Sequence, residues 1–321
     1  IINTFSKNYT IHQVAISGNR AVIGAPEENS PRGKTGTVYV YERDASTGAW
    51  SQFMRLVPSD AGNDLKFGYS VSIEDDLLVV GTSVRDSYSR GHAYVFRRNA
   101  VTWIQAAKLT NPLDRGLFGH AVSVTGNTIA VSDASSFSNQ YGSVFVYRFN
   151  SLSNAWEESS DGALTALTSM DAQLFSTVCD GGFGSSLELI DGGGGLLVGC
   201  SGEEDSTGAV YYYKQSSDGL YQFQQRIAAP DGKPGDMFGS LSKVSVAGGV
   251  MTIGTDRDYG SAHVYTLHNG YWATVAEIAV PDDSIFFGQS LALSGDDIII
   301  SSQNNVHHYK AEECAGTHSF L

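Results

Sequence analysis

The chain repeats one pattern of hydrophobic and polar positions along most of its length. A copy begins with a Phe-Gly pair and a run in which apolar and polar residues alternate, as in Phe67 to Ile73. Such alternation is typical of a strand with one buried face. A short turn of Gly, Asn or Asp follows, because these residues adopt the backbone angles that tight hairpins need. The next run, such as Leu78 to Gly81, is almost wholly apolar and predicts a strand buried on both faces.

Two further strands complete each copy. After a polar loop of variable length, the third strand carries alternating aromatic residues, as in Val38-Tyr39-Val40-Tyr41. The fourth strand opens on an aromatic residue, which is Trp50, Trp103, Trp156, Tyr221 or Trp272. Four antiparallel strands form the blade of a β-propeller. One such sheet cannot bury both faces by itself, so we expect successive copies to stack.

The number of copies predicts the architecture. Phe-Gly pairs begin at residues 67, 118, 183, 238 and 287, and a first copy around Val14 to Ser17 lacks the pair. The sequence therefore predicts an all-β fold, a β-propeller of about six four-stranded blades, with seven blades as the alternative. We expect residues 1–321 to form this single domain, with 310–321 as a C-terminal tail or the start of a linker. The longest interval places an insertion in the third copy, around 151–182.

The last copy lacks a convincing fourth strand before the chain reaches Leu321. We expect the segment Ile2 to Tyr9 to supply it. Pairing of the N- and C-terminal segments would close the propeller and remove two open sheet edges.

The repeated unit resembles the FG-GAP repeat, which occurs in the head of the integrin α-subunit and in many secreted or cell-surface propellers. The Phe-Gly pairs and Gly24-Ala25-Pro26 carry this resemblance. The calcium loop of integrin-type repeats, Asp-x-Asp/Asn-x-Asp-Gly-x-x-Asp, is missing, because short turns such as Gly18-Asn19 stand between the first two strands. Such turns cannot offer the oxygen ligands that calcium prefers. The resemblance implies an extracellular interaction or adhesion module without metal sites.

Charge and composition exclude several partners. The chain has 20 Lys and Arg against 34 Asp and Glu, a net charge of −14, which argues against nucleic-acid binding. No apolar run approaches the roughly 20 residues of a membrane span. We expect no cofactor. The sequon Asn8-Tyr9-Thr10 makes Asn8 a candidate glycosylation site.

The three cysteines are Cys179, Cys200 and Cys314, so at least one of them cannot form a disulfide within this chain. A Cys179–Cys200 disulfide is one arrangement, and Cys200 as an apolar filler of a buried strand is the other.

The loops between the second and third strands of each copy hold the candidate binding residues, since such loops lie on one face of a propeller. Their mixture of acidic, basic and aromatic side chains suits a protein or glycan partner, although solvated loops are also polar. These residues are Glu27, Glu28, Arg85, Asp86, Tyr88, Asp133, Tyr141, Glu203, Glu204, Asp205, Asp256, Asp258 and Tyr259.

No familiar catalytic or metal-binding motif stands in the sequence. Adjacent His307 and His308 point to opposite faces of a strand and cannot easily share an ion. The remaining histidines, His263 among them, are scattered and suit core or surface roles. We therefore predict a non-catalytic extracellular or cell-surface module that binds a protein partner or neighbouring subunits. The alternatives are a glycan-binding lectin and a glycoside-processing enzyme with carboxylates at the channel mouth.

Overall fold

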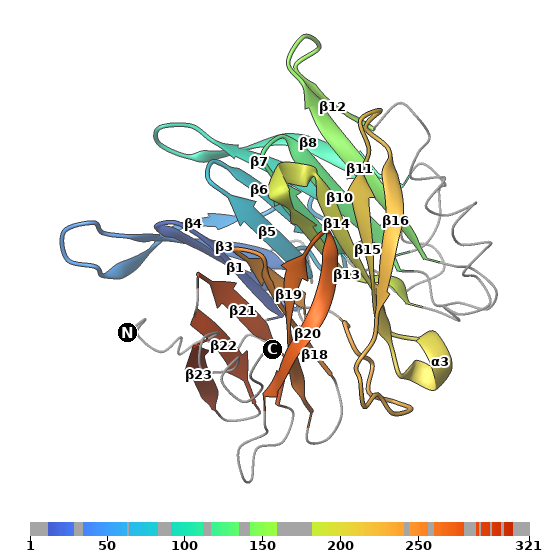
Figure 1. Ribbon diagram of the computed structural model, residues 1–321. Helices are drawn as coiled ribbons and strands as arrows, with labels where there is room; N and C mark the ends of the chain where they lie inside the picture. The colour runs from blue at the N-terminus through green and yellow to red at the C-terminus, as the bar shows by residue number, and fades with distance from the viewer. Residues whose placement is uncertain are drawn as a thin grey trace. The chain divides into compact units, whose positions relative to one another are not determined.

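The computed structural model describes an all-β chain of six antiparallel sheets (Figure 1). The described residues are 12–28, 35–62, 64–82, 91–111, 117–134, 142–158, 182–240, 244–255, 260–278, 287–288, 290–295, 297–302 and 305–310. They belong to two compact units, one of residues 1–134 and 144–160 and the other of 135–143 and 161–321. Each unit is described by itself.

The first unit contains three four-stranded sheets, named blades 1 to 3, whose strands follow chain order. The strands are β1 (Gln13–Ser17), β2 (Arg20–Ala25), β3 (Thr37–Arg43) and β4 (Trp50–Leu56) in blade 1; β5 (Ser70–Glu74), β6 (Leu77–Gly81), β7 (His92–Arg98) and β8 (Trp103–Thr110) in blade 2; and β9 (Phe118–Thr125), β10 (Thr128–Asp133), β11 (Ser143–Asn150) and β12 (Ala155–Glu158) in blade 3.

The second unit contains blades 4 to 6, of which the last has three described strands. The elements are β13 (Phe183–Ile190), η1 (Asp191–Gly193), β14 (Gly195–Cys200), the short α3 (Glu203–Ser206), β15 (Ala209–Gln215) and β16 (Tyr221–Ile227) in blade 4; β17 (Val244–Ala247), β18 (Val250–Gly254), β19 (Ala262–His268) and β20 (Tyr271–Ile278) in blade 5; and β21 (Leu291–Ser294), β22 (Asp297–Ser301) and β23 (Val306–Lys310) in blade 6.

The Phe-Gly pairs explain how neighbouring blades come close. Phe67, Phe118, Phe238 and Phe287 are fully buried. Gly68, at the start of blade 2, has a φ of 91°, and a Cβ added to Gly24 of blade 1 would lie 2.0 Å from the Gly68 carbonyl oxygen. A side chain cannot be accommodated in either place, so glycine is needed for this approach of two backbones.

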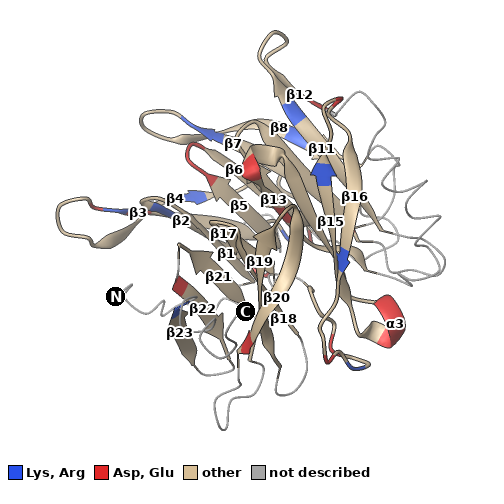
Figure 2. Cartoon of the chain, in the orientation of Figure 1, with Lys and Arg blue, Asp and Glu red and all other residues tan. Residues whose placement is uncertain are grey.

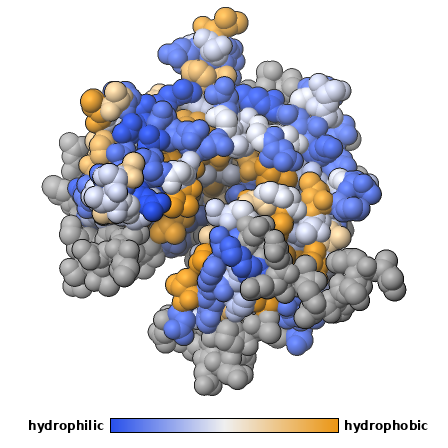
Figure 3. Space-filling model, turned by 60° about the vertical axis from the view of Figure 1, so that its left-hand side comes forward, coloured by the Kyte–Doolittle hydropathy of each residue, from blue (hydrophilic) through white to orange (hydrophobic). Residues whose placement is uncertain are grey.

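The second strands of blades 2 and 4 are buried throughout, as their apolar runs predict. All five residues of β6 and all six of β14 are buried. On the molecular surface shown in Figure 3, by contrast, hydrophilic side chains predominate and hydrophobic ones appear in smaller groups between them. Charged side chains are sparse on the described strands, and the acidic α3 stands out in Figure 2.

These sheets are the blades of a β-propeller, so the predicted fold class is confirmed. Blade 6 shows three strands among the described residues. The predicted closing segment Ile2 to Tyr9, most of the insertion (159–181) and the tail 311–321 fall outside them. Within the part that the structure describes, no helix has the length and hydrophobicity of a membrane span.

Candidate functional site

One position of the third strand is the centre of a side-chain cluster in several blades. In blades 1 to 5 it lies three residues after a glycine. Where the blade has a Phe-Gly pair, the ring at this position contacts its Phe, with centroids 5.5 Å apart for Phe67–Tyr94 and 5.7 Å apart for Phe238–His263. The residues at this position, blades 1 to 6, are Tyr39, Tyr94, Phe145, Tyr211, His263 and His307.

Blade 4 shows the cluster in its fully paired form. The Tyr211 hydroxyl donates to Glu203 Oε2 at 2.6 Å, and Arg226 Nε lies 2.5 Å from Glu203 Oε1. Register places Arg226 of β16 opposite Tyr211. Glu203 is completely buried, so its charge needs these two partners.

Blade 1 repeats this arrangement. The Tyr39 hydroxyl donates to Glu28 Oε2 at 2.8 Å, and Arg55 Nη2 lies 3.1 Å from Glu28 Oε1. Two candidate binding residues, Glu28 and Glu203, are therefore engaged inside their own blades.

Blade 2 uses an acid from a different loop. Asp60, in the connection before β5, accepts from the Tyr94 hydroxyl at 3.0 Å and from Lys108 Nζ at 2.5 Å. Burial works to raise the pKa of Asp60, but the hydrogen bonds from Lys108 and Tyr94 outweigh it and hold the pKa below its ordinary value. This cluster also contains one acid and one cation.

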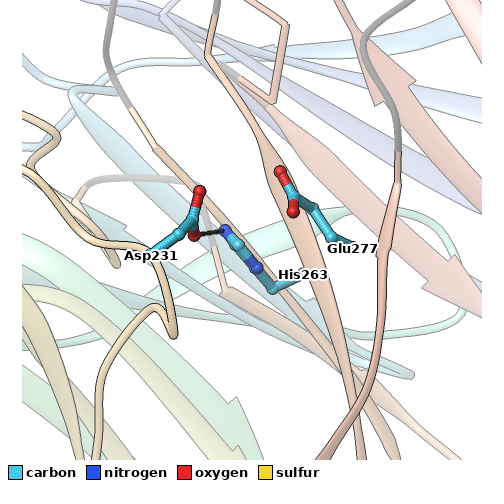
Figure 4. Close-up of side chains that lie close together, drawn as sticks. All are labelled: Asp231, His263 and Glu277. Atoms are coloured by element: carbon cyan, nitrogen blue, oxygen red, sulfur yellow. Dashed lines mark ion pairs between the residues drawn. The ribbon is translucent and has the colours of Figure 1, made fainter.

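Blade 5 breaks the charge pattern. Asp231 follows the last residue of β16 by four positions, just as Asp60 follows the last residue of β4. His263 occupies the tyrosine position, and Glu277 of β20 lies opposite it, where blade 2 has Lys108. One ligand atom from each of Asp231, His263 and Glu277 lies within 4.8 Å of the other two (Figure 4). We call these three residues the 231–263–277 cluster.

His263 is the buried member of the cluster. Its side chain is 1% exposed, and this burial lowers its pKa below 6.5, although the negative charges of Asp231, Glu277 and Asp236 oppose the shift. Nε2 lies 3.8 Å from Asp231 Oδ1 and 3.0 Å from Ser261 Oγ. Nδ1 is buried and has no hydrogen-bond partner among the described residues.

The two carboxylates form the solvent-exposed side of the cluster. Asp231 is 56% exposed, and Glu277 is exposed as well. Within the described part of the chain, neither forms an ion pair with Lys or Arg. One buried nitrogen and two accessible carboxylates can hold a water molecule or a metal ion.

Glu188 of β13 is a second unusual titratable group. Burial raises its pKa to about 8, so the carboxyl is mostly protonated at pH 7. In blades 2 and 5 the corresponding residues are Ser72 and Ser245, which accept hydrogen bonds from the next blade's Val124 and Leu293 amides. Among the described residues, no hydrogen bond or ion pair connects Glu188 with the 231–263–277 cluster.

The other candidate residues are dispersed. Glu27 pairs with Lys66 at 3.2 Å, and Glu204 on α3 lies 3.3 Å from Arg226 Nη2. Asp205 is exposed beside it. Asp133 is buried and accepts hydrogen bonds from Asn111 Nδ2 and the Leu117 amide. The remaining predicted residues lie outside the described ones: Asn8, Arg85, Asp86, Tyr88, Tyr141, Cys179, Asp256, Asp258 and Tyr259.

Cys200 is disulfide-bonded, which corrects its interpretation as an apolar filler. Its partner lies outside the described residues. His307 and His308 face different partners, as predicted for adjacent strand residues. His307 Nε2 lies 3.0 Å from Ser302 Oγ, whereas His308 Nε2 lies 2.5 Å from Asp297 Oδ1.

Sequence reasoning missed the 231–263–277 cluster because it treated His263 as an isolated histidine. The signal was a joint substitution within the repeat. His263 stands where blades 1, 2 and 4 have tyrosine, and Glu277 stands where they have Arg55, Lys108 and Arg226. A simultaneous loss of the cation and the phenol marks blade 5 as different.

Comparison with known proteins supports the fold. Residues 50–96 match the family model of the FG-GAP repeat. No curated protein matches the chain. A putative 6-phosphogluconolactonase from Bacteroides uniformis aligns with a TM-score of 0.57 and 13% identity over 91% of this chain and 78% of its own. The periplasmic gluconolactonase of Pseudomonas aeruginosa aligns with a TM-score of 0.57 and 14% identity over 92% and 80%.

A putative 6-phosphogluconolactonase from Bacteroides fragilis gives a TM-score of 0.58 and 11% identity over 91% of this chain and 77% of its own. These likenesses contradict the prediction of a non-catalytic adhesion module that is not an enzyme, because three solved structures of similar fold are named as lactonases. At such low identity they establish the fold and not the reaction. The chain is a six-bladed β-propeller that carries an FG-GAP repeat.

Proposed function

We propose that the chain is a hydrolase of sugar-derived lactones, with the 231–263–277 cluster as its active site. The observation that carries the proposal is the convergence of a buried imidazole and two exposed carboxylates. The propellers of similar fold that are named as gluconolactonases support the choice of reaction. The resemblance in fold does not itself assign an activity, so the proposal depends on the cluster.

The reaction needs a nucleophilic water and a place for its proton. Water attacks the lactone carbonyl carbon, the bond from that carbon to the ring oxygen breaks, and the ring oxygen leaves as a hydroxyl. The products are one carboxylic acid and one alcohol, so water supplies all the added atoms. Asp231, Glu277 and His263 offer acceptors that can hold this water and take its proton.

The charge of the cluster favours an uncharged lactone. Asp231 and Glu277 are both acidic, and no Lys or Arg among the described residues pairs with either. A phosphorylated lactone would bring further negative charge to within a few ångströms of these carboxylates, which is unfavourable. We therefore expect neutral aldonolactones to be better substrates than 6-phosphorylated ones.

The test is hydrolysis of a lactone panel by the purified chain, followed as acid release with a pH indicator and corrected for spontaneous opening. Glu277→Gln removes one carboxylate charge with little change in shape, and His263→Tyr installs the side chain that three other blades have at this position. We expect each to lower kcat/KM by about 100-fold or more. His307→Tyr is the matched control, since it makes the same exchange in blade 6.

A panel on which no lactone opens faster than in buffer would end the proposal, as would full activity of His263→Tyr. A glycoside-processing enzyme is the second candidate, because Asp231 and Glu277 place carboxylate oxygens within 4.8 Å of each other, not far from the about 5 Å separation in retaining glycosidases. Release of nitrophenol from a panel of nitrophenyl glycosides, lost in Glu277→Gln, would favour it.

We also propose that the protein works outside the cytosol. The disulfide bond at Cys200 supports this location, because disulfides persist in oxidising compartments. Fractionation of the source cells with thiol labelling of Cys200 tests it. A reduced Cys200 in a cytosolic fraction would contradict the proposal.

A further inference from the structure

We propose that Asp231, His263 and Glu277 bind one divalent transition-metal ion, of which Zn²⁺ is the best fit and Mn²⁺ the next. The metal site is inferred from the geometry of blade 5. A catalytic role for the metal rests on the proposed function, because a metal-bound water would be the nucleophile of the hydrolase.

The spacing of the donor atoms fits a metal. His263 Nε2 and Asp231 Oδ1 are 3.8 Å apart, too far for a hydrogen bond between them. Two ligand atoms at about 2.1 Å from Zn²⁺ in a tetrahedral site lie about 3.4 Å apart. The whole set lies within 4.8 Å. Asp231 and Glu277 are exposed, so their side chains can rotate to bring their oxygens closer to the His263 nitrogen.

The comparison between blades supplies an independent argument. In blades 1, 2 and 4 the acid that accepts from the tyrosine hydroxyl is neutralised by Arg55, Lys108 or Arg226. In blade 5 the cationic position is occupied by a second acid, Glu277, opposite His263. Blade 5 therefore lacks the Lys or Arg that lies opposite the ring residue in blades 1, 2 and 4, and a second negative charge stands in its place. A bound cation restores the balance that the other blades achieve with a side chain.

The donor types select the metal. An imidazole nitrogen together with two carboxylates suits Zn²⁺ or Mn²⁺. Ca²⁺ prefers six to eight oxygens and no nitrogen, so three donors of this kind serve it poorly. Three protein ligands leave a fourth position for water, the arrangement of catalytic zinc sites.

One existing contact must change when the metal binds. Ser261 Oγ lies 3.0 Å from His263 Nε2 and competes for the same nitrogen. Ser261 has another partner available, since Thr255 Oγ1 lies 3.3 Å from its hydroxyl oxygen. Loss of the contact with His263 therefore does not leave the Ser261 hydroxyl without a hydrogen bond.

The test is calorimetric titration of the EDTA-treated, dialysed full chain with ZnCl₂, MnCl₂ and CaCl₂. We expect one Zn²⁺ site per chain, weaker binding of Mn²⁺ and no saturable Ca²⁺ binding. His263→Tyr/Glu277→Lys gives blade 5 the side chains of blade 2 and should weaken Zn²⁺ binding at least 100-fold. Glu277→Gln keeps the shape of the site and should weaken it about 10-fold or more. His308→Gln is the control for exposed histidine and should bind as the wild type does.

Unchanged Zn²⁺ affinity in both blade 5 variants would overturn the proposal, and circular dichroism confirms that each variant is folded. The outcomes separate the two proposals. Stoichiometric Zn²⁺ binding without lactone hydrolysis rejects the proposed function but retains the metal site. Full lactone hydrolysis by the EDTA-treated chain, with no Zn²⁺ binding, rejects the metal and retains the hydrolase.

Discussion

Blades 2 and 5 place chemically opposite groups on the same backbone pattern. In blade 2, Asp60 accepts from Tyr94 and Lys108 at 3.0 and 2.5 Å, so acid, phenol and cation satisfy one another. In blade 5, Asp231 comes from the matching loop, but it meets His263 and a second acid, Glu277. The backbone register that pairs strands 3 and 4 is the same.

The difference teaches that two substitutions in a repeat can replace an acid paired with a cation by two acids beside an imidazole. A closed set of partners leaves nothing for a ligand, whereas two carboxylates that no described Lys or Arg neutralises, beside a buried imidazole, retain acceptors for one. Two like charges close together are unfavourable, and a ligand that binds them in the folded state stabilises the fold. The predictions below test this contrast.

The largest effect should come from the buried acid of blade 4. Glu203→Ala leaves the Arg226 guanidinium and the Tyr211 hydroxyl without their partner, and we expect it to lower the free energy of unfolding by about 3 kcal/mol. Glu277→Ala, the matched change in blade 5, should alter it by no more than about 0.5 kcal/mol because no Lys or Arg among the described residues pairs with its carboxylate. Chemical denaturation of the two variants measures both. Equal losses would show that the blade 5 acid is structural.

The reverse conversion should create a metal site. Tyr94→His/Lys108→Glu gives blade 2 the donor types of blade 5 around Asp60. We expect a second Zn²⁺ per chain, bound at least about 100-fold more tightly than by unaltered blade 2. Tyr94→Phe/Lys108→Met, which also removes the ion pair but adds no ligand, is the control. A stoichiometry that stays at one would mean that donor types alone do not make the site.

Restoring the cation in blade 5 should give a smaller gain. Glu277→Lys places a positive charge opposite His263 and near Asp231, and we expect metal-free stability to rise by about 0.5 kcal/mol, the usual worth of a partly exposed pair. Thermal unfolding of the EDTA-treated protein at low and high salt measures it, since a gain from an ion pair shrinks with salt. Glu277→Gln, without the new charge, should show a smaller gain.

The smallest effect concerns the loss of folding stability at low pH that Asp60 of blade 2 causes. The folded-state pKa of Asp60 lies below its ordinary 3.8. Ionised Asp60 therefore stabilises the folded state fully above pH 3.8. This stabilisation is lost as the pH falls through the lower pKa that Asp60 has in the folded state. Because this carboxylate is partly exposed, we expect only about 0.3 kcal/mol. Lys108→Met should flatten the fall in stability between pH 4 and 2, and an unchanged curve would contradict this.

Local sequence rules predicted the fold because every element of the repeat is encoded locally. Alternation, tight-turn residues and apolar second strands each act over a few neighbours, and six phased copies reinforce one another. Phe67 and Gly68 illustrate this, since burial of the ring and a positive φ at the glycine could both be anticipated from the pair. The same rules located Glu28 and Glu203 on connecting segments.

The sequence by itself determined the blades, their order and the place of Glu277 at the end of a fourth strand. Only the tertiary structure decided that Asp231, from the loop after blade 4, reaches His263 and Glu277 of blade 5. It also decided their register, since the shift between Val264 and Tyr265 brings Glu277 opposite His263. A shift of one residue turns a side chain to the other face of a sheet. Such an encounter depends on chain segments far apart in sequence, and no local pattern specifies it.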